Sequence, residues 1–486
     1  MKNFLDVMKF GGTSVADATC IARAAQIVAQ AARDGQIIVV VSAMSGVTNR
    51  LIDGARRAET GDREAGAALA HGLHKQHEAA LHALIPPGER RENLARQISS
   101  VLLEAQRLCD GTALLRELTP RTLDAISGLG ERLSAPMVAG AITELGVRAR
   151  AVDAAELIVT DSHHGNSEPI WDETGGRSEA VLRPLLGDGI VPVVTGFIGA
   201  TLDGILTTLG RGGSDFSATI LGAALKADEI IIWTDVDGVM TADPRLVPDA
   251  CTIPEISYRE AAELAYFGAK VLHPKTLRAV MKAGIPVWIR NSFAPERPGT
   301  KITPVGRASG AGVKALTAMS DVALISVGGP GIVGVPDVVG RTFSTTASMR
   351  ANVLLISQSS SQNDICFIVS SEDAKRTVEA LRKEFSQDLI HQTLEHITLD
   401  PDIAIVAAVG ENMRGTPGIA GRTFSALGRD NVNIIAIAQG SSESNISFVV
   451  ERKAMRAALK STHREFKLGT RGSCQEKSSE NNSGFR

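Results

Sequence analysis

Short runs of β-branched residues alternate with longer segments of helical periodicity over the first 300 or so residues. Three of the runs, at 36–42 (QIIVVVS), 190–195 (IVPVVT) and 229–234 (EIIIWT), predict buried strands. Between 51 and 118 the pattern is helical and rich in Ala, Leu, Glu and Arg, with a break predicted at Pro86-Pro87. This alternation predicts an α/β sheet with a helical cover.

The pattern changes between 293 and 312 (FAPERPGTKITPVGRASGAG), where the composition predicts a connection rather than a packed element. Beyond it the chain repeats itself without gaps. Gly-Arg-Thr-Phe-Ser at 340–344 recurs at 421–425, and Gln358 aligns with Gln439. Each copy predicts a βαββα unit. Identical polar residues at turn positions favour binding of a small ligand by the pair of units, and a duplicated structural brace is the alternative.

These patterns divide the chain into five parts. We expect an α/β domain over 1–295, a linker over 296–316, and the two βαββα units over 317–390 and 391–467. The remaining residues, 468–486, are polar and low in aliphatics, which predicts a disordered tail.

The composition excludes several classes of protein. With 486 residues, 44% hydrophobic, 22% charged and a net charge of −3, the chain predicts a soluble protein of two or three domains without a nucleic-acid partner. Five scattered cysteines with no C-x-x-C pair indicate neither a disulfide framework nor a zinc site. Asp6 and Lys9 interrupt the N-terminus where a signal peptide needs apolar residues, and no segment is apolar for long enough to span a membrane. We therefore expect a cytoplasmic protein with no membrane partner.

Four glycine-bearing polar turns follow apolar strands. They are at 7–15 (VMKFGGTSV), 40–49 (VVSAMSGVTN), 209–218 (LGRGGSDFSA) and 234–245 (TDVDGVMTADPR). Glycines let backbone N–H groups approach a phosphate, and a helix start adds its positive dipole end. Such turns gather at one edge of an open α/β sheet, where ligands bind. There is no Walker A motif, so the chain is not a P-loop kinase.

Together with 127–132 (SGLGER) and 267–275 (FGAKVLHPK), these motifs resemble the aspartokinase family of the amino-acid kinase fold. That fold is a three-layer α/β/α sandwich. The repeat resembles the family's two ACT domains, which are ferredoxin-like βαββα units, and its Gln-Ser-Ser-Ser and Gln-Gly-Ser-Ser-Glu turns are most similar to those of threonine-sensitive members. The resemblance extends from Lys2 to about Leu468.

The resemblance implies an MgATP-dependent kinase that phosphorylates the β-carboxylate of aspartate. The products are 4-phospho-L-aspartate and ADP, in the first step of the lysine, threonine and methionine pathway. An amino acid regulates such enzymes by feedback, with threonine favoured here and lysine next. The ACT domains imply a homodimer or a larger assembly. The family also includes fusions to homoserine dehydrogenase, and we expect this chain to be either monofunctional or a fragment.

The resemblance also assigns the site residues. The catalytic pair is Lys9, which stabilises the γ-phosphate, and Asp215, which organises the centre. Substrate binding falls to Ser42, Thr48, Glu131, Arg211, Gly212 and Ser214, with Glu131 meeting the substrate ammonium and Arg211 the α-carboxylate. The nucleotide-binding set is Gly11, Gly12, Gly213, Thr234, Asp235, Met240, Arg245 and Lys270, although the family often carries Tyr at the position of Met240. The effector-binding set is Asn352, Gln358, Asn433 and Gln439.

Two other functions are alternatives. One is another kinase of the same fold, such as a glutamate or acetylglutamate kinase, and the other is an amino-acid sensor whose kinase domain has decayed. Two further patterns are discounted. Gly329 to Gly334 spells a dinucleotide fingerprint but lacks an acidic residue about 20 positions on, and His71, His74 and His77 are interpreted as a solvated helix face rather than a metal site.

Overall fold

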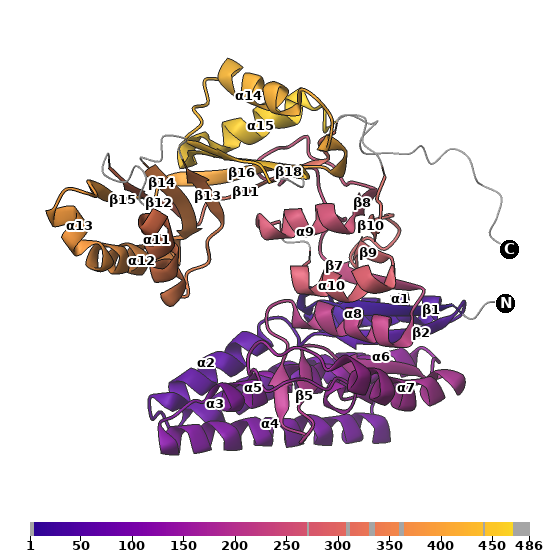
Figure 1. Ribbon diagram of the computed structural model, residues 1–486. Coiled ribbons are helices and arrows are strands. Elements are labelled where there is room, and N and C mark those ends of the chain that lie inside the picture. The colour runs from indigo at the N-terminus through magenta and orange to yellow at the C-terminus, as the bar shows by residue number, and fades with distance from the viewer. Residues whose placement is uncertain are drawn as a thin grey trace, which may run out of the picture. The chain divides into compact units, whose positions relative to one another are not determined.

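The computed structural model describes residues 4–269, 272–307, 312–329, 336–358, 364–440 and 443–469 (Figure 1). The chain forms two compact units. The first comprises Met1–Val239, Pro254–Tyr258 and Val271–Gly306, and the second comprises Met240–Ile253, Arg259–Lys270 and Arg307–Arg486. Two short segments of the predicted α/β domain therefore fold with the repeats. Most of the 329–334 fingerprint and, of the predicted tail, residues 470–486 lie outside the described residues, whereas Leu468, the first residue of that tail, is buried in the core of the second unit.

The first unit is built on an eight-stranded sheet in the order β3-β4-β2-β1-β7-β9-β10-β8. The strands are β1 (Leu5–Phe10), β2 (Gln36–Val41), β3 (Ala149–Val152), β4 (Val191–Thr195), β7 (Glu229–Thr234), β8 (Glu255–Ser257), β9 (Val287–Asn291) and β10 (Thr300–Thr303). From β3 to β9 all neighbours are parallel, and β10 runs antiparallel to β9. The three strands predicted from β-branched runs are confirmed as β2, β4 and β7.

Strand β10 corrects one expectation, because it lies inside the predicted linker. Its sequence Thr-Lys-Ile-Thr is short and flanked by Gly and Pro, so composition concealed it. Ile302 is fully buried and pairs with Val287 of β9, which makes this stretch part of the sheet. A separate two-stranded sheet, β5 (Ile198–Ala200) with β6 (Leu206–Thr208), precedes the third glycine-bearing turn.

Helices cover both faces of the large sheet, as the resemblance implied. Met8 and Phe10 share one core with α1 (Ala18–Ala31) and α6 (Leu129–Glu144). Val7 and Ile230 face α8 (Gly213–Leu225), where a Cβ at Gly222 would come within 2.5 Å of Ile230. The remaining helices of this unit include α7 (Trp171–Gly187) and α10 (Pro274–Ala283).

The helices predicted between 51 and 118 are confirmed, but they pack on α1 and α6 rather than directly on the sheet. They are α2 (Val47–Glu59), α3 (Ala65–Leu84) and α4 (Glu89–Leu115), which pack against one another (Figure 1), followed by α5 (Pro120–Ser127). The break at Pro86-Pro87 separates α3 from α4, and a second break follows Thr60, where Gly61 has a φ of 90°.

The histidines of α3 do not share one solvated face. His71 is exposed, but His77 is completely buried and its Nδ1 hydrogen-bonds the Leu73 carbonyl at 2.8 Å. The solvated interpretation is wrong for His77, because α2 and α4 both pack against α3 and the side chain of His77 is fully buried. Burial lowers the pKa of His77 and so favours the neutral ring.

The second unit contains two βαββα repeats, as predicted. The first is β12 (Val322–Gly328), α11 (Pro336–Ser348), β13 (Leu355–Gln358), β14 (Asp364–Ser370) and α12 (Ser371–Glu384), followed by α13 (Ser386–Ile390). The second is β16 (Ile403–Val409), α14 (Ile419–Arg429), β17 (Ala436–Ala438), β18 (Asn445–Glu451) and α15 (Met455–Glu465). Helix α9 (Tyr258–Tyr266) also packs here, through a buried 2.7 Å ion pair between Glu260 and Lys314.

Two strands cross the boundaries expected between these repeats. The sheets have the orders β13-β14-β12-β15 and β11-β16-β18-β17. Strand β15 (His396–Asp400) follows the first repeat and pairs with β12, although the sequence assigned it to the second. Strand β11 (Ala315–Met319) precedes the first repeat and pairs with β16 of the second. Each repeat therefore borrows one strand from beyond its own sequence span.

The repeated Gly-Arg-Thr-Phe-Ser motif is explained by packing. Arg341 lies over the Phe385 ring at 4.4 Å and binds the Glu384 carboxylate, and Arg422 lies over Phe466 at the same distance and binds Glu465. In both repeats the motif arginine thereby fixes the first helix of the unit to the C-terminal end of its second helix. This part of the repeat therefore has a packing role in each unit.

The cysteines depart from expectation at one position. Cys20, Cys109 and Cys366 are free thiols, whereas Cys251 is disulfide-bonded, a pairing that the scattered cysteine positions did not predict.

Asp6 of β1 provides a test of the electrostatics of the sheet. Its Oδ1 is buried without a hydrogen-bond partner among the described residues, and burial, together with Glu229 and Asp228, raises its pKa to about 6. A raised pKa means that folding favours the protonated acid, so this contribution to stability is present at low pH and is lost as pH rises from about 4 to about 6.

We expect Asp6→Asn to raise the melting temperature at pH 7.5 by roughly 2–4 °C, and to have a smaller effect at pH 4.5, where the wild-type acid is largely protonated. Thermal denaturation at both pH values measures this. Asp34→Asn, at an exposed position, is the matched control. An equal gain at both pH values would contradict the electrostatic explanation.

Candidate active site

A pocket of about 560 Å³ lies in the first unit, where β1, β2 and β7 end. It is lined by every predicted catalytic and substrate-binding residue and by four of the predicted nucleotide-binding residues. These are Lys9, Asp215, Ser42, Thr48, Glu131, Arg211, Gly212, Ser214, Gly11, Gly12, Gly213 and Thr234. The parallel strands thus bring together residues separated by more than 200 positions in the sequence.

Backbone geometry suits this pocket to anions. Gly46 and Gly212 adopt left-handed conformations with φ of 77° and 71°, and the chain enters α2 and α8 directly after them. At Gly12 a Cβ would come within 3.2 Å of the Ala43 carbonyl, so the first two turns lie close together. Helix N-termini present unpaired N–H groups, which bind phosphate and carboxylate groups.

An ion pair joins the two predicted catalytic residues. Lys9 Nζ lies 2.5 Å from Asp215 Oδ1, and the two side chains are 11% and 17% exposed. The lysine amine also lies 3.3 Å from where a Cβ at Gly11 would be, so a larger residue there would crowd it. The pair is sheltered from water yet open to the pocket, which strengthens its field on a bound ligand.

Glu131 lies in the first turn of α6 and is only 3% exposed. Its Oε1 accepts a 3.1 Å hydrogen bond from the Ala43 N–H, whereas its Oε2 is buried without a partner among the described residues. Burial raises the pKa of Glu131 to about 8, against the lowering effects of the backbone hydrogen bonds and Lys9. Such a carboxyl ionises readily when a cationic group enters beside it.

Arg211 supplies the second positive charge. It lies in the turn between Gly210 and Gly212, is exposed, and lines the pocket. With Lys9, Asp215 and Glu131, it gives the pocket separate positive and negative groups, which suits a zwitterionic ligand together with a phosphate.

Phe197 was not predicted from the sequence. It follows β4, lines the pocket, and has a φ of 69°, a strained value for an aromatic residue. Its N–H donates to the Ser217 hydroxyl at 3.0 Å, and its ring packs where a Cβ at Gly213 would lie. The available signal was the Thr-Gly-Phe turn at 195–197, directly after a predicted strand.

The remaining nucleotide-binding residues do not line this pocket. Asp235 follows Thr234 and accepts its hydroxyl at 3.2 Å. Met240 and Arg245 belong to the second unit, where Met240 accepts a hydrogen bond from Thr252 and exposed Arg245 pairs with Asp243 at 2.6 Å. Lys270 lies outside the described residues.

The four predicted effector residues are all exposed. Gln358 ends β13 and Gln439 follows β17, and these edge strands of the two sheets lie next to each other. Asn352 and Asn433 precede the same strands. The turns that follow the two glutamines, at 359–363 and 441–442, lie outside the described residues.

Within the described part of the chain there is no group of three or more His, Cys, Asp or Glu side chains that could hold a metal ion. No helix among the described residues combines the length and the apolar character that crossing a membrane requires.

Comparison with known proteins places the chain in a class. Residues 5–291 match the model of the amino acid kinase family, and residues 325–385 and 406–466 each match an ACT domain model. The chain therefore has the fold of the amino acid kinase family, followed by two ACT domains.

Individual relatives define the family more narrowly. Aspartokinase 1, chloroplastic, of Arabidopsis thaliana is 30% identical over 478 residues, which are 96% of this chain and 80% of that protein. A bifunctional aspartokinase/homoserine dehydrogenase 1 of the same plant is 38% identical over 468 residues, covering 95% of this chain and 51% of that protein. The structure of E. coli aspartokinase III with aspartate and ADP matches with a TM-score of 0.77 at 30% identity, over 95% of this chain and 99% of that one. The chain belongs to the aspartokinase family, and it spans about half the length of the bifunctional relatives.

The two left-handed glycines differ in their surroundings, which generates a prediction. A Cβ at Gly46 would meet nothing within 4 Å, whereas one at Gly212 would lie 2.9 Å from the His273 Cβ. We expect Gly46→Ala to cost only the backbone strain, about 1–2 kcal/mol, and Gly212→Ala to cost more because His273 must also move. Chemical denaturation of both variants measures the difference. Equal losses would contradict the predicted contact with His273.

Proposed function

We propose that this chain transfers the γ-phosphoryl group of ATP to the β-carboxylate of aspartate. The observation that carries the proposal is the Lys9–Asp215 pair between glycine-bearing turns, in one pocket with the unpartnered Oε2 of Glu131 and the exposed Arg211. A similar solved structure, E. coli aspartokinase III, was determined with aspartate and ADP.

The reaction needs no general base from the protein. The β-carboxylate of aspartate, with a reference pKa of about 3.9, is already ionised at neutral pH and attacks the γ-phosphorus directly. What the site must supply is alignment and neutralisation of charge on the transferring group. Lys9 and the N–H groups of the turns after β1 and β2 fill this role, and Asp215 orients the Lys9 amine.

Mg²⁺ would enter with ATP. Mg²⁺ is commonly bound through substrate phosphates and only one or two carboxylates. Asp215, which lines the pocket, and Asp235, which follows the pocket residue Thr234 in the sequence, could supply these carboxylates. When bound, the ion withdraws charge from the phosphates.

Glu131 and Arg211 select the amino-acid end of the substrate. The unpartnered Oε2 of Glu131 would receive the ammonium group, and the fork of Arg211 would bind the α-carboxylate in bidentate fashion. A substrate with a longer side chain, such as glutamate, would then extend its carboxylate past the position aligned with Lys9.

Regulation by an amino acid is the second half of the proposal. The edge strands β13 and β17 lie next to each other, Gln358 ends the first and Gln439 follows the second, and we assign the effector to this region, with threonine favoured and lysine next. E. coli aspartokinase III has been solved with lysine and aspartate in a T-state. Assembly as a homodimer or larger oligomer through the ACT domains, a place in the lysine, threonine and methionine pathway, and a cytoplasmic location belong to the same proposal.

The test is coupled ADP release with MgATP and aspartate, glutamate or N-acetylglutamate, with and without millimolar threonine or lysine. We expect turnover on aspartate, suppressed by threonine, and a loss of about 100-fold or more in kcat for Lys9→Met because a charge on the phosphoryl path is removed. Lys75→Met, at an exposed position on α3, is the matched control. Turnover on another acceptor alone, or a fully active Lys9→Met, would overturn the proposal.

The pKa of Glu131 makes a separate prediction. Because this pKa is raised to about 8, the free enzyme below pH 8 must release a proton from Glu131 before its carboxylate can pair with the ammonium group. The KM for aspartate should therefore fall as pH rises from about 6 towards 8, and level off above it. In Glu131→Gln the KM should be higher and this pH dependence absent. A wild-type KM that is constant over this range would contradict the assignment.

A further inference from the structure

A second carboxylate of the first unit, that of Asp124, is buried outside the active-site pocket. It lies on α5 and is 3% exposed, yet it faces several hydrogen-bond donors. Its Oδ2 lies 2.8 Å from His164 Nδ1, and both oxygens lie 3.0 Å from the Gly165 N–H. Its Oδ1 accepts the Thr208 hydroxyl at 2.5 Å. Asp124 therefore ties three separate segments, α5, the loop at 163–165 and the end of β6, to one point.

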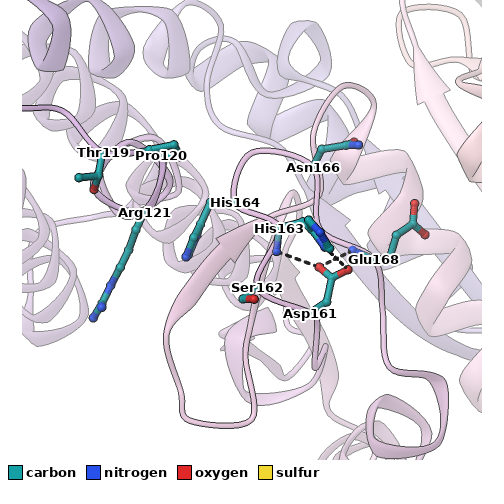
Figure 2. Close-up of a pocket in the computed structure, with 9 residues that line it drawn as sticks. All are labelled: Thr119, Pro120, Arg121, Asp161, Ser162, His163, His164, Asn166 and Glu168. Carbon is teal, nitrogen blue, oxygen red and sulfur yellow. Dashed lines mark hydrogen bonds and ion pairs between the residues drawn. The ribbon is translucent and has the colours of Figure 1, made fainter. Parts of the chain in front are cut away.

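The loop that Asp124 holds is itself a compact turn, which we define as the 161–168 loop (Figure 2). Asp161 accepts hydrogen bonds from the His163 N–H at 3.1 Å and from the Glu168 N–H at 3.2 Å. Ser167 donates its N–H to the Thr208 carbonyl at 2.9 Å, which adds a second connection to β6. The two adjacent histidines differ, since the His163 side chain is 84% exposed and that of His164 is 16% exposed.

The same loop packs against the turn that carries Arg211. A Cβ at Gly210 would lie 2.8 Å from Asn166 Oδ1 and 3.0 Å from the Gly165 carbonyl oxygen. The Asn166 amide oxygen also accepts a 2.6 Å hydrogen bond from Lys275, which fixes this side chain from α10. Thr208, bonded to Asp124, is only three residues before Arg211.

We propose that Asp124 is a positioning residue for Arg211, acting through Thr208 and the 161–168 loop. Its carboxylate holds β6 and the loop in register, and these hold the Gly210–Gly212 turn so that the guanidinium stands where the substrate α-carboxylate arrives. The inference rests on the proposed function, because it assumes that Arg211 binds this carboxylate.

The conformation of the Gly210–Gly212 turn supports a positioning role for Asp124. Gly210 and Gly212 are left-handed, with φ of 79° and 71°, so the turn derives little rigidity from its own side chains. Its position depends on what packs against it, and a displacement of about 1 Å in a substrate-binding group lowers rates by up to 100-fold. Asparagine at 124 retains the shape but replaces one acceptor by an amide donor, which would face a donor from the loop or from Thr208.

The test separates positioning from folding by kinetics with aspartate and with ATP. We expect Asp124→Asn to raise the KM for aspartate by about 10-fold, leaving the KM for ATP within twofold of wild type. Thr208→Val, which removes a single donor, should have the same effect in smaller degree. His164→Ala should raise the KM for aspartate, and His163→Ala, its exposed neighbour, is the matched control and should not.

A double-mutant cycle with Arg211→Lys supplies the decisive comparison. If Asp124 acts through Arg211, adding Asp124→Asn to Arg211→Lys should change the KM for aspartate by less than twofold. The full 10-fold factor in that background, or no change in the KM for aspartate in any variant, would overturn the inference. If Asp124→Asn does not fold, the same cycle is run with Thr208→Val. Absence of wild-type turnover on aspartate would instead count against the proposed function, so the two failures are distinguishable.

Discussion

The parallel pairing of β1 with β2 on one side and β7 on the other is the constraint on which the rest of the structure depends. Lys9 pairs with Val40 and Ile232, so all three strands end at the same edge. A slip of one residue in β1 would turn Lys9 from the pocket into the sheet face that α1 and α6 cover. The register therefore places the lysine, while the glycines after each strand let the chain turn sharply enough to leave space for a ligand.

The four charged side chains of the pocket differ in burial and in pairing. Lys9 is neutralised by Asp215, Arg211 faces water, and Glu131 is so deeply buried that it holds its proton near neutral pH. Without a ligand the pocket thus avoids an uncompensated buried negative charge, which would be costly. When an ammonium group is present, Glu131 can ionise and pair with it. The charge of the pocket is therefore suited to a ligand that carries an ammonium group.

Most of the fold could be predicted from the sequence, because buried β-branched runs and helical periodicity are local signals. The gapless repeat identified the two βαββα units, since the same residues must fill the same core positions twice. Local signals did not reveal β10, whose four residues depend on β8 and β9 for their burial, nor the exchange of β11 and β15, which is a choice among sheet partners distant in the sequence.

The candidate site, too, could be predicted only in part. Residues within the glycine-bearing turns were predicted because glycines and charged side chains directly after a strand indicate phosphate binding from the sequence alone. Phe197 was missed because an aromatic residue after a strand reads as core, and Asp124 because a lone acid in a helix reads as solvated. Their hydrogen-bond partners Ser217 and Thr208 lie 20 and 84 residues away in the sequence.

The exchanged strands of the second unit have a consequence for how the chain folds during synthesis. Strand β11 leaves the ribosome before the first repeat, but β16, its only neighbour in the sheet, follows that whole repeat. Until then β11 is an unpaired hydrophobic segment, and the second sheet cannot be completed. The two repeats are thus linked by more than their order in the sequence, because a chain that ends after the first repeat keeps β11 but lacks the strand with which β11 pairs.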